Sequence, residues 1–91
     1  MKIGIICAGG TEFAPFCKAL GGALTRERAL LRFYSGKLGN ADVTALFSGV
    51  CKVNAAIACQ ALIDDYNPDF IINAGVCGGL DPSVELFDTV V

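Results

Sequence analysis

The stretch Met1-Lys2-Ile3-Gly4-Ile5-Ile6-Cys7-Ala8-Gly9-Gly10-Thr11-Glu12 opens the chain and decides its fold class. Residues 3–8 form a continuous apolar run that two glycines end, which is typical of a strand buried on both faces. Apolar residues then recur at helical spacing before Gly21-Gly22, which predicts a helix that ends at these glycines (Phe13, Phe16, Cys17, Leu20). A buried strand that leads at once into a helix favours an α/β fold.

Glu12 lies at the junction between this strand and this helix. We expect Pro15 in the first turn of the helix, where its missing N–H costs little, so Glu12 falls at or just before the helix N-terminus. The helix dipole there favours an ionised carboxylate, which suits a base that acts at neutral pH. An exposed acid that only serves the helix N-terminus is the alternative interpretation.

The remaining residues predict a mixed sheet and a second helix. Residues 30–38 and 42–47 predict two strands of a hairpin that turns at Gly39-Asn40, so the sheet is not purely parallel. Residues 52–66 predict a helix that Asn67-Pro68 ends. Residues 70–74 predict another buried strand, residues 23–28 a polar connection, and a last strand is expected near Phe87. The expected fold class is therefore α/β, with a mixed β-sheet flanked by two helices.

Two further junctions are of the same kind as the first. The turn Ser48-Gly49-Val50-Cys51-Lys52-Val53-Asn54-Ala55-Ala56 joins a strand to a helix, and Ile71-Ile72-Asn73-Ala74-Gly75-Val76-Cys77-Gly78-Gly79-Leu80 leaves a strand through glycines. If the strands run side by side, all three junctions share the rim where open α/β sheets hold small ligands. This arrangement predicts a pocket for a small polar molecule. The glycines at residues 75–79 do not open a long helix, which argues against a dinucleotide-binding motif. A glycine-rich turn that only allows tight packing is the alternative to a ligand-binding loop.

Composition excludes several classes of function. The 91 residues carry a net charge of −2, with no basic run, so we expect no nucleic-acid partner. No apolar run is long enough to span a bilayer and the N-terminus lacks a signal-peptide pattern, so we expect a cytoplasmic protein without a membrane partner. Hydrophobic residues make up 54% of the chain, more than a small free-standing domain needs. The excess apolar residues contact either a partner chain or the rest of a longer protein. The apolar residues at positions 87–91 favour a longer protein.

The five cysteines do not form a metal site, because no C-x-x-C pair and no histidine is present. We expect small buried thiols in a reducing compartment, with Cys51 and Cys77 lining the pocket rim. The basic residues are scattered over the hairpin, which indicates a solvated face rather than a phosphate track, and the acids that close the second helix are expected to be solvated too (Arg26, Arg28, Arg32, Lys37, Asp64, Asp65).

Five ordered stretches resemble the amino-terminal part of 5′-methylthioadenosine/S-adenosylhomocysteine nucleosidases, in the purine nucleoside phosphorylase-like superfamily. They are Lys2-Ile3-Gly4-Ile5-Ile6, Phe33-Tyr34-Ser35-Gly36-Lys37-Leu38, Ser48 to Ala56 as quoted above, Pro68-Asp69-Phe70-Ile71-Ile72-Asn73-Ala74-Gly75 and Gly78-Gly79-Leu80. The resemblance implies an α/β fold around a mixed, barrel-like sheet and a homodimer. It also implies hydrolysis of the N-glycosidic bond of a small-molecule adenine nucleoside, with no metal and no cofactor.

The resemblance also implies site residues. The catalytic glutamate, which orients and deprotonates the attacking water, falls on Glu12, and the residues that line the ribose and base site fall on Ala8, Val50, Val76, Cys77 and Gly78. An attacking water opposite the leaving base, held by a carboxylate, is the arrangement that inverting glycoside hydrolysis uses.

The chain departs from the family pattern in several places. Gly9-Gly10-Thr11 stands where an acidic run is usual, Val76 where a small hydroxyl residue is usual, and Cys7 where glycine is common. The family's ribose-binding glutamate and purine-protonating aspartate belong to a carboxy-terminal half beyond these residues. We therefore expect residues 1–91 to be the N-terminal portion of the domain and the isolated chain to be inactive.

Two other functions fit the same residues. One is a purine or uridine nucleoside phosphorylase of the same superfamily; such enzymes usually bring an arginine to the loop after the first strand, and residues 7–14 contain none. The other is a non-catalytic fragment or module that associates with itself through exposed apolar edges.

Overall fold

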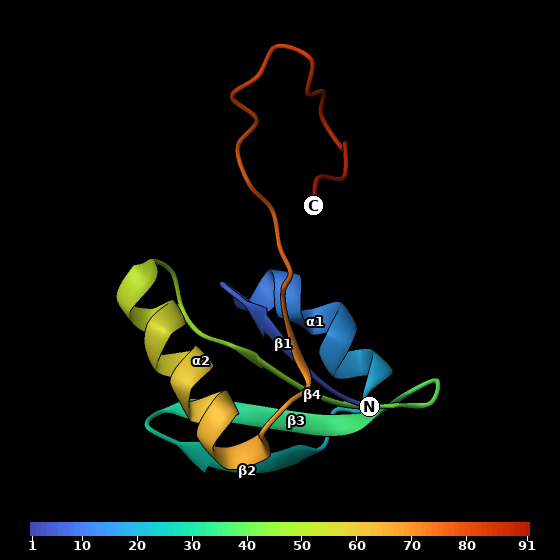
Figure 1. Cartoon of the computed structure of the whole chain (residues 1–91), viewed down its shortest axis with the longest axis vertical. Coiled ribbons are helices and arrows are strands. Elements are labelled where there is room, and N and C mark those ends of the chain that lie inside the picture. The colour runs from blue at the N-terminus through green and yellow to red at the C-terminus, as the bar shows by residue number, and fades with distance from the viewer.

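The computed structural model describes residues 1–91 and contains one five-stranded sheet of order β2-β3-β4-β1-β5, with two helices (Figure 1). Neighbouring strands β4, β1 and β5 run parallel, whereas β2, β3 and β4 run antiparallel. The predicted α/β fold with a mixed sheet and two flanking helices is thereby confirmed. The elements are β1 (Lys2–Cys7), α1 (Gly10–Ala19), β2 (Leu24–Arg28), β3 (Leu31–Leu38), β4 (Ala41–Phe47), α2 (Lys52–Tyr66) and β5 (Phe70–Asn73).

The two helices cover opposite faces of the sheet. Successive strand side chains point to opposite faces, so Ile5 and Ile6 of β1 enter two different core clusters. The α1 side holds one cluster (Ile5, Cys7, Phe13, Leu20, Val43, Ala45) and the α2 side holds the other (Ile6, Leu31, Phe33, Leu46, Ala58, Ala61, Leu62). The central strands are therefore buried on both faces, as the continuous apolar run at the start of the chain predicts.

The polar connection predicted for residues 23–28 is wrong, because residues 24–28 form the edge strand β2. All five of its residues are exposed, so no apolar alternation marks it as a strand. Its hairpin turn carries Ala29 (φ 51°) and Leu30 (φ 65°), in the left-handed region where glycine or asparagine is usual. The usual signs of a hairpin are therefore missing from the sequence.

The position predicted for Pro15 is also wrong. Helix α1 begins at Gly10, so Pro15 lies inside the helix, beyond its first turn. The helix starts early because Gly9 is its N-cap, and the carbonyl of Gly9 accepts the N–H of Phe13 at 3.1 Å. Glu12 consequently lies within the first turn as the third helical residue.

The carboxy-terminal part of the chain differs most from expectation. The sequence predicts a buried strand at residues 70–74, but all four residues of β5 are exposed, since it is an edge strand that pairs with β1 alone. No strand forms near Phe87: after β5 an irregular tail extends away from the sheet (Figure 1), with Leu80 and Phe87 almost fully exposed. A strand needs a neighbouring strand for its backbone groups, and the backbone groups of residues 77–91 bond only within that segment. Within these residues the sheet is open rather than barrel-like.

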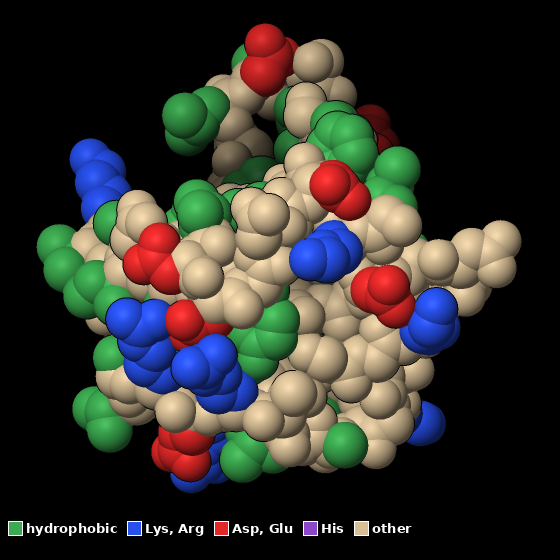
Figure 2. Space-filling view, turned by 60° about the horizontal axis from the view of Figure 1, so that its bottom comes forward, with side chains coloured by type: hydrophobic (Ala, Val, Ile, Leu, Met, Phe, Trp, Pro, Cys, Tyr) green, Lys and Arg blue, Asp and Glu red, His purple; other side chains and the backbone are tan.

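The charged hairpin face is not simply solvated. Asp65 of α2 pairs with Arg28 at 2.6 Å and with Arg26 at 3.8 Å, and its side chain is only 8% exposed. The expectation of a solvated Asp65 is therefore wrong. On the face that Figure 2 presents, Lys and Arg side chains lie beside Asp and Glu side chains rather than in one continuous basic patch.

The cysteines are less buried than predicted. Only Cys7 is buried; Cys17 and Cys59 are half-buried, and Cys51 and Cys77 are exposed. No group of three or more metal-ligating side chains gathers anywhere in the chain. Neither helix has the combination of length and apolar character that crossing a bilayer requires.

Candidate active site

The three junctions lie side by side at one rim of the sheet. Cys7 is in register with Phe47 of β4, and Ile6 with Asn73 of β5, so these parallel strands end together. The loops continue the pairing: Ser48 N–H donates to the Cys7 carbonyl at 2.8 Å, and Ala74 N–H donates to the Ile6 carbonyl at 2.9 Å. The rim predicted from the sequence therefore exists, because parallel strands present their carboxyl ends at one edge.

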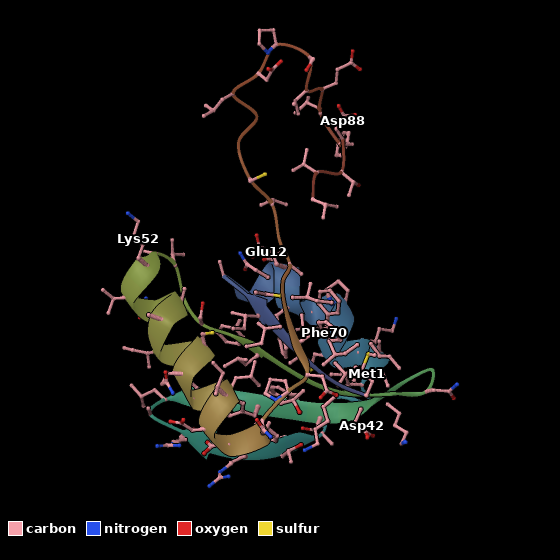
Figure 3. The ribbon with its side chains drawn as sticks, in the orientation of Figure 1. Met1, Glu12, Asp42, Lys52, Phe70 and Asp88 are labelled. Carbon is pink, nitrogen blue, oxygen red and sulfur yellow. The ribbon has the colours of Figure 1, made fainter.

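Glu12 lies at this rim, at the base of the tail (Figure 3). Three backbone N–H groups donate to its carboxylate. Ala8 and Gly9 donate to Oε2 at 3.1 and 3.2 Å, and Val76 donates to Oε1 at 2.9 Å. The first two belong to the exit of β1 and the third to the exit of β5. The carboxylate therefore joins two strand exits, and Val76 lies 64 residues after Glu12 in sequence.

These hydrogen bonds control the protonation of Glu12. The N–H of Val76 is the main cause that lowers the pKa of the Glu12 carboxyl below its ordinary value; Gly9 and Ala8 add to it, against partial burial, which raises the pKa. Burial, and then the negative charge of Glu12, raises the pKa of the Cys7 thiol. Glu12 is thus ionised at neutral pH, and its remaining lone pairs can accept a hydrogen bond from water, whereas Cys7 stays a thiol.

A cavity of about 590 Å³ opens beside Glu12. The rim forms one side and the tail the other, and the lining is Ala8, Glu12, Asn73, Ala74, Gly75, Val76, Cys77, Leu86, Phe87, Asp88, Thr89 and Val90. Four of the residues expected at the site thus surround one cavity: Ala8, Glu12, Val76 and Cys77.

Two expected residues lie outside this lining. Val50, in the loop after β4, is 67% exposed, and Gly78 belongs to the tail beyond the cavity. For both, the role in substrate binding stays a prediction. The group of Val76 that contacts Glu12 is its backbone N–H, so this contact does not depend on a side-chain hydroxyl.

Sequence reasoning missed two glycines that contact Glu12 and offer no side chain. Gly9 donates to Glu12, and Gly75 lies against the carboxylate, so a Cβ at position 75 would be 2.8 Å from Oε1. Backbone donors have no signature of residue type. The one available signal was position, since each glycine is the second residue after the end of a strand, β1 for Gly9 and β5 for Gly75.

Known proteins are similar to this chain in sequence and in fold. A family model described as "Phosphorylase superfamily" matches residues 2–91, and the chain belongs to this superfamily. Within it, the chain is similar to 5′-methylthioadenosine/S-adenosylhomocysteine nucleosidases. The protein of that name from Exiguobacterium sp. is 43% identical over 91 residues, and the one from Pseudoalteromonas translucida is 40% identical over the same length. In both cases the match covers 100% of this chain and 39% of the relative.

Solved structures agree with this grouping. A nucleosidase of this name from Colwellia psychrerythraea, in complex with adenine, superposes with a TM-score of 0.88 at 40% identity. The match covers 93% of this chain and 35% of that chain. The enzyme from S. pneumoniae, with the transition-state inhibitor MT-ImmA, gives a TM-score of 0.86 at 28% identity over 93% of this chain and 37% of that one. The chain thus spans well under half the length of these relatives.

Proposed function

We propose that the protein carrying this chain hydrolyses the N-glycosidic bond of 5′-methylthioadenosine and S-adenosylhomocysteine. The observation that carries the proposal is the carboxylate of Glu12, which three N–H groups from two strand exits hold at the edge of the cavity. The names of the relatives and the adenine bound to the Colwellia enzyme support this substrate class.

The chemistry follows from the state of that carboxylate. As the glycosidic C–N bond breaks, its electron pair leaves with the adenine, and the sugar becomes oxocarbenium-like. A water that donates a hydrogen bond to Glu12 attacks the anomeric carbon and passes its proton to the carboxylate. A carboxylate with a lowered pKa is a weak base, so its main contribution is to orient the water, whose acidity rises as the new C–O bond forms.

The remaining parts of the site are inferred to lie elsewhere in the whole protein. We infer that residues 1–91 form its N-terminal portion and supply one side of the pocket, with Ala8, Val50, Val76, Cys77 and Gly78 near the nucleoside. The coverage of 39% of each curated relative supports this division. The acid that protonates the purine and the ribose-binding glutamate would come from outside these residues, so the isolated chain should be inactive.

Phosphorolysis is the closest competing reaction. Residues 7–14 contain no arginine that could hold a phosphate at the loop after β1, which favours water as the nucleophile. Assays with and without phosphate separate the two reactions, because only phosphorolysis produces a ribose 1-phosphate. Rates that depend on phosphate would contradict the proposal of hydrolysis.

Homo-oligomerisation and a cytoplasmic location belong to the same proposal. Large apolar side chains are exposed on the first half of α2 and on β5, including Val53 (72%), Ile57 (49%) and Phe70 (58%). Such surfaces suit contact with further protein, either the rest of the chain or a second copy. Analytical ultracentrifugation of the whole protein measures the oligomeric state directly.

The test of the proposed function is Glu12→Gln in the whole protein, with adenine release from 5′-methylthioadenosine as the measurement. We expect a loss of about 10²–10⁴-fold in kcat, because the neutral amide orients the water less strongly than the carboxylate and cannot take its proton. Glu27→Gln is the matched control, since Glu27 lies on the opposite edge strand β2 and is exposed. A Glu12→Gln enzyme as fast as the wild type would refute the role of Glu12.

A further inference from the structure

The exit of β5 touches the carboxylate of Glu12 at a residue that has no side chain. A Cβ built on Gly75 would lie 2.8 Å from Oε1 and 2.9 Å from both Cδ and Oε2 of Glu12. These separations are shorter than real Cβ contacts. Since three N–H groups hold the carboxylate in place, it cannot move aside without losing hydrogen bonds.

The backbone at this position does not itself demand glycine. Gly75 is not among the residues with positive φ, whereas Gly49, in the loop after β4, has a φ of 86°. A side chain at position 75 therefore meets no conformational barrier of its own. What excludes it is the carboxylate of Glu12.

We propose that Gly75 is a positioning residue: its lack of a side chain lets the β5 exit close on Glu12, so that the Val76 N–H reaches Oε1. The inference rests on the proposed function, in which Glu12 orients the attacking water. A methyl group at position 75 would separate the carboxylate from the Val76 N–H, by moving either the glutamate or the loop. Misplacement of a catalytic group by about 1 Å can cost roughly 10²-fold in rate.

The first test measures the carboxylate directly and needs no activity. Glu12 is titrated by carboxyl ¹³C NMR in the wild-type protein, in Gly75→Ala and in Gly10→Ala. Gly10 is the matched control, because it lies two residues before Glu12 at the start of α1 and a Cβ there has nothing within 4 Å. We expect the pKa of Glu12 to rise toward its ordinary value in Gly75→Ala and to stay unchanged in Gly10→Ala. An unchanged pKa in folded Gly75→Ala overturns the proposal.

The second test asks whether the two side chains compete for the same space. Glu12→Asp shortens the acid by one methylene and leaves room for the methyl group at position 75. We expect Gly75→Ala to reduce kcat by about 10- to 100-fold in the Glu12 protein and by much less in the E12D background. Equal losses in both backgrounds overturn the proposal.

The outcomes separate this inference from the proposed function. If the pKa of Glu12 moves in Gly75→Ala but the wild-type protein releases no adenine, Gly75 positions Glu12 and the proposed reaction is wrong. If Gly75→Ala fails to fold but the double variant with Glu12→Asp folds, the steric conflict is demonstrated by folding itself. If neither variant folds, Glu12 is not what demands glycine at position 75, and the proposal is overturned.

Discussion

Replacing Arg28 by methionine should destabilise the protein more than replacing its partner Asp65 by asparagine. The two residues form the shortest ion pair in the structure, with Nη1 of Arg28 donating to Oδ1 of Asp65 at 2.6 Å. They differ in burial: the side chain of Asp65 is 8% exposed and that of Arg28 is 50% exposed. The second oxygen, Oδ2, has no hydrogen-bond partner and only Arg26 Nε at 3.8 Å.

The expected loss in the free energy of unfolding depends on which charged group each variant leaves without its partner. Arg28→Met removes a charge-assisted hydrogen bond and leaves a largely buried carboxylate with one distant cation, so we expect a loss of about 2–3 kcal/mol in the free energy of unfolding. Asp65→Asn keeps a neutral acceptor and leaves two half-exposed arginines that water can solvate, so we expect a loss of about 1 kcal/mol.

Urea unfolding of the whole protein, with a shared m-value, measures both losses. Arg32→Met is the matched control, because Arg32 faces Glu27 at 3.8 Å and both side chains are more than half exposed. We expect less than about 0.5 kcal/mol for this control. The reasoning is refuted if Arg28→Met costs no more than Asp65→Asn, or no more than Arg32→Met.

Two further predictions concern the pH response and the β2–β3 turn. Hydrogen bonds lower the pKa of the Glu12 carboxyl in the folded protein. The ionised carboxylate therefore stabilises the fold at any pH above the pKa that Glu12 has in the unfolded chain. This stabilisation is lost as the pH falls through the pKa that Glu12 has in the folded protein. The stability difference between wild type and Glu12→Gln should therefore be constant above about pH 5 and shrink at lower pH; a difference that stays constant down to about pH 3 would contradict this. Replacing Ala29-Leu30 by Asn-Gly should raise the free energy of unfolding by about 1 kcal/mol, because both residues have positive φ and Leu30, 96% exposed, loses no packing. An unchanged urea midpoint would contradict the strain assigned to this turn.

Much of the fold could be read from hydrophobic patterning. The first strand, the hairpin at Gly39-Asn40 and the helix at residues 52–66 all carry local signals, and the structure has each of them. The edge strand β2 carries none, because its residues are exposed and its turn uses Ala29 and Leu30. Near Phe87 the reverse holds: the sequence has apolar, strand-like residues, but a strand needs a neighbour that these 91 residues do not supply.

The sequence by itself determined the α/β class, the three strand exits and Glu12 as the acid at the first of them. Each of these depends on interactions between residues near in the chain, namely apolar periodicity, glycine breaks and a helix start. Only the tertiary structure decided that the N–H of Val76 reaches Glu12 and that Gly75 must lack a side chain there. The parallel pairing of β1 with β5 creates both contacts across more than 60 residues, and neither a backbone donor nor an excluded volume leaves a mark on local residue pattern.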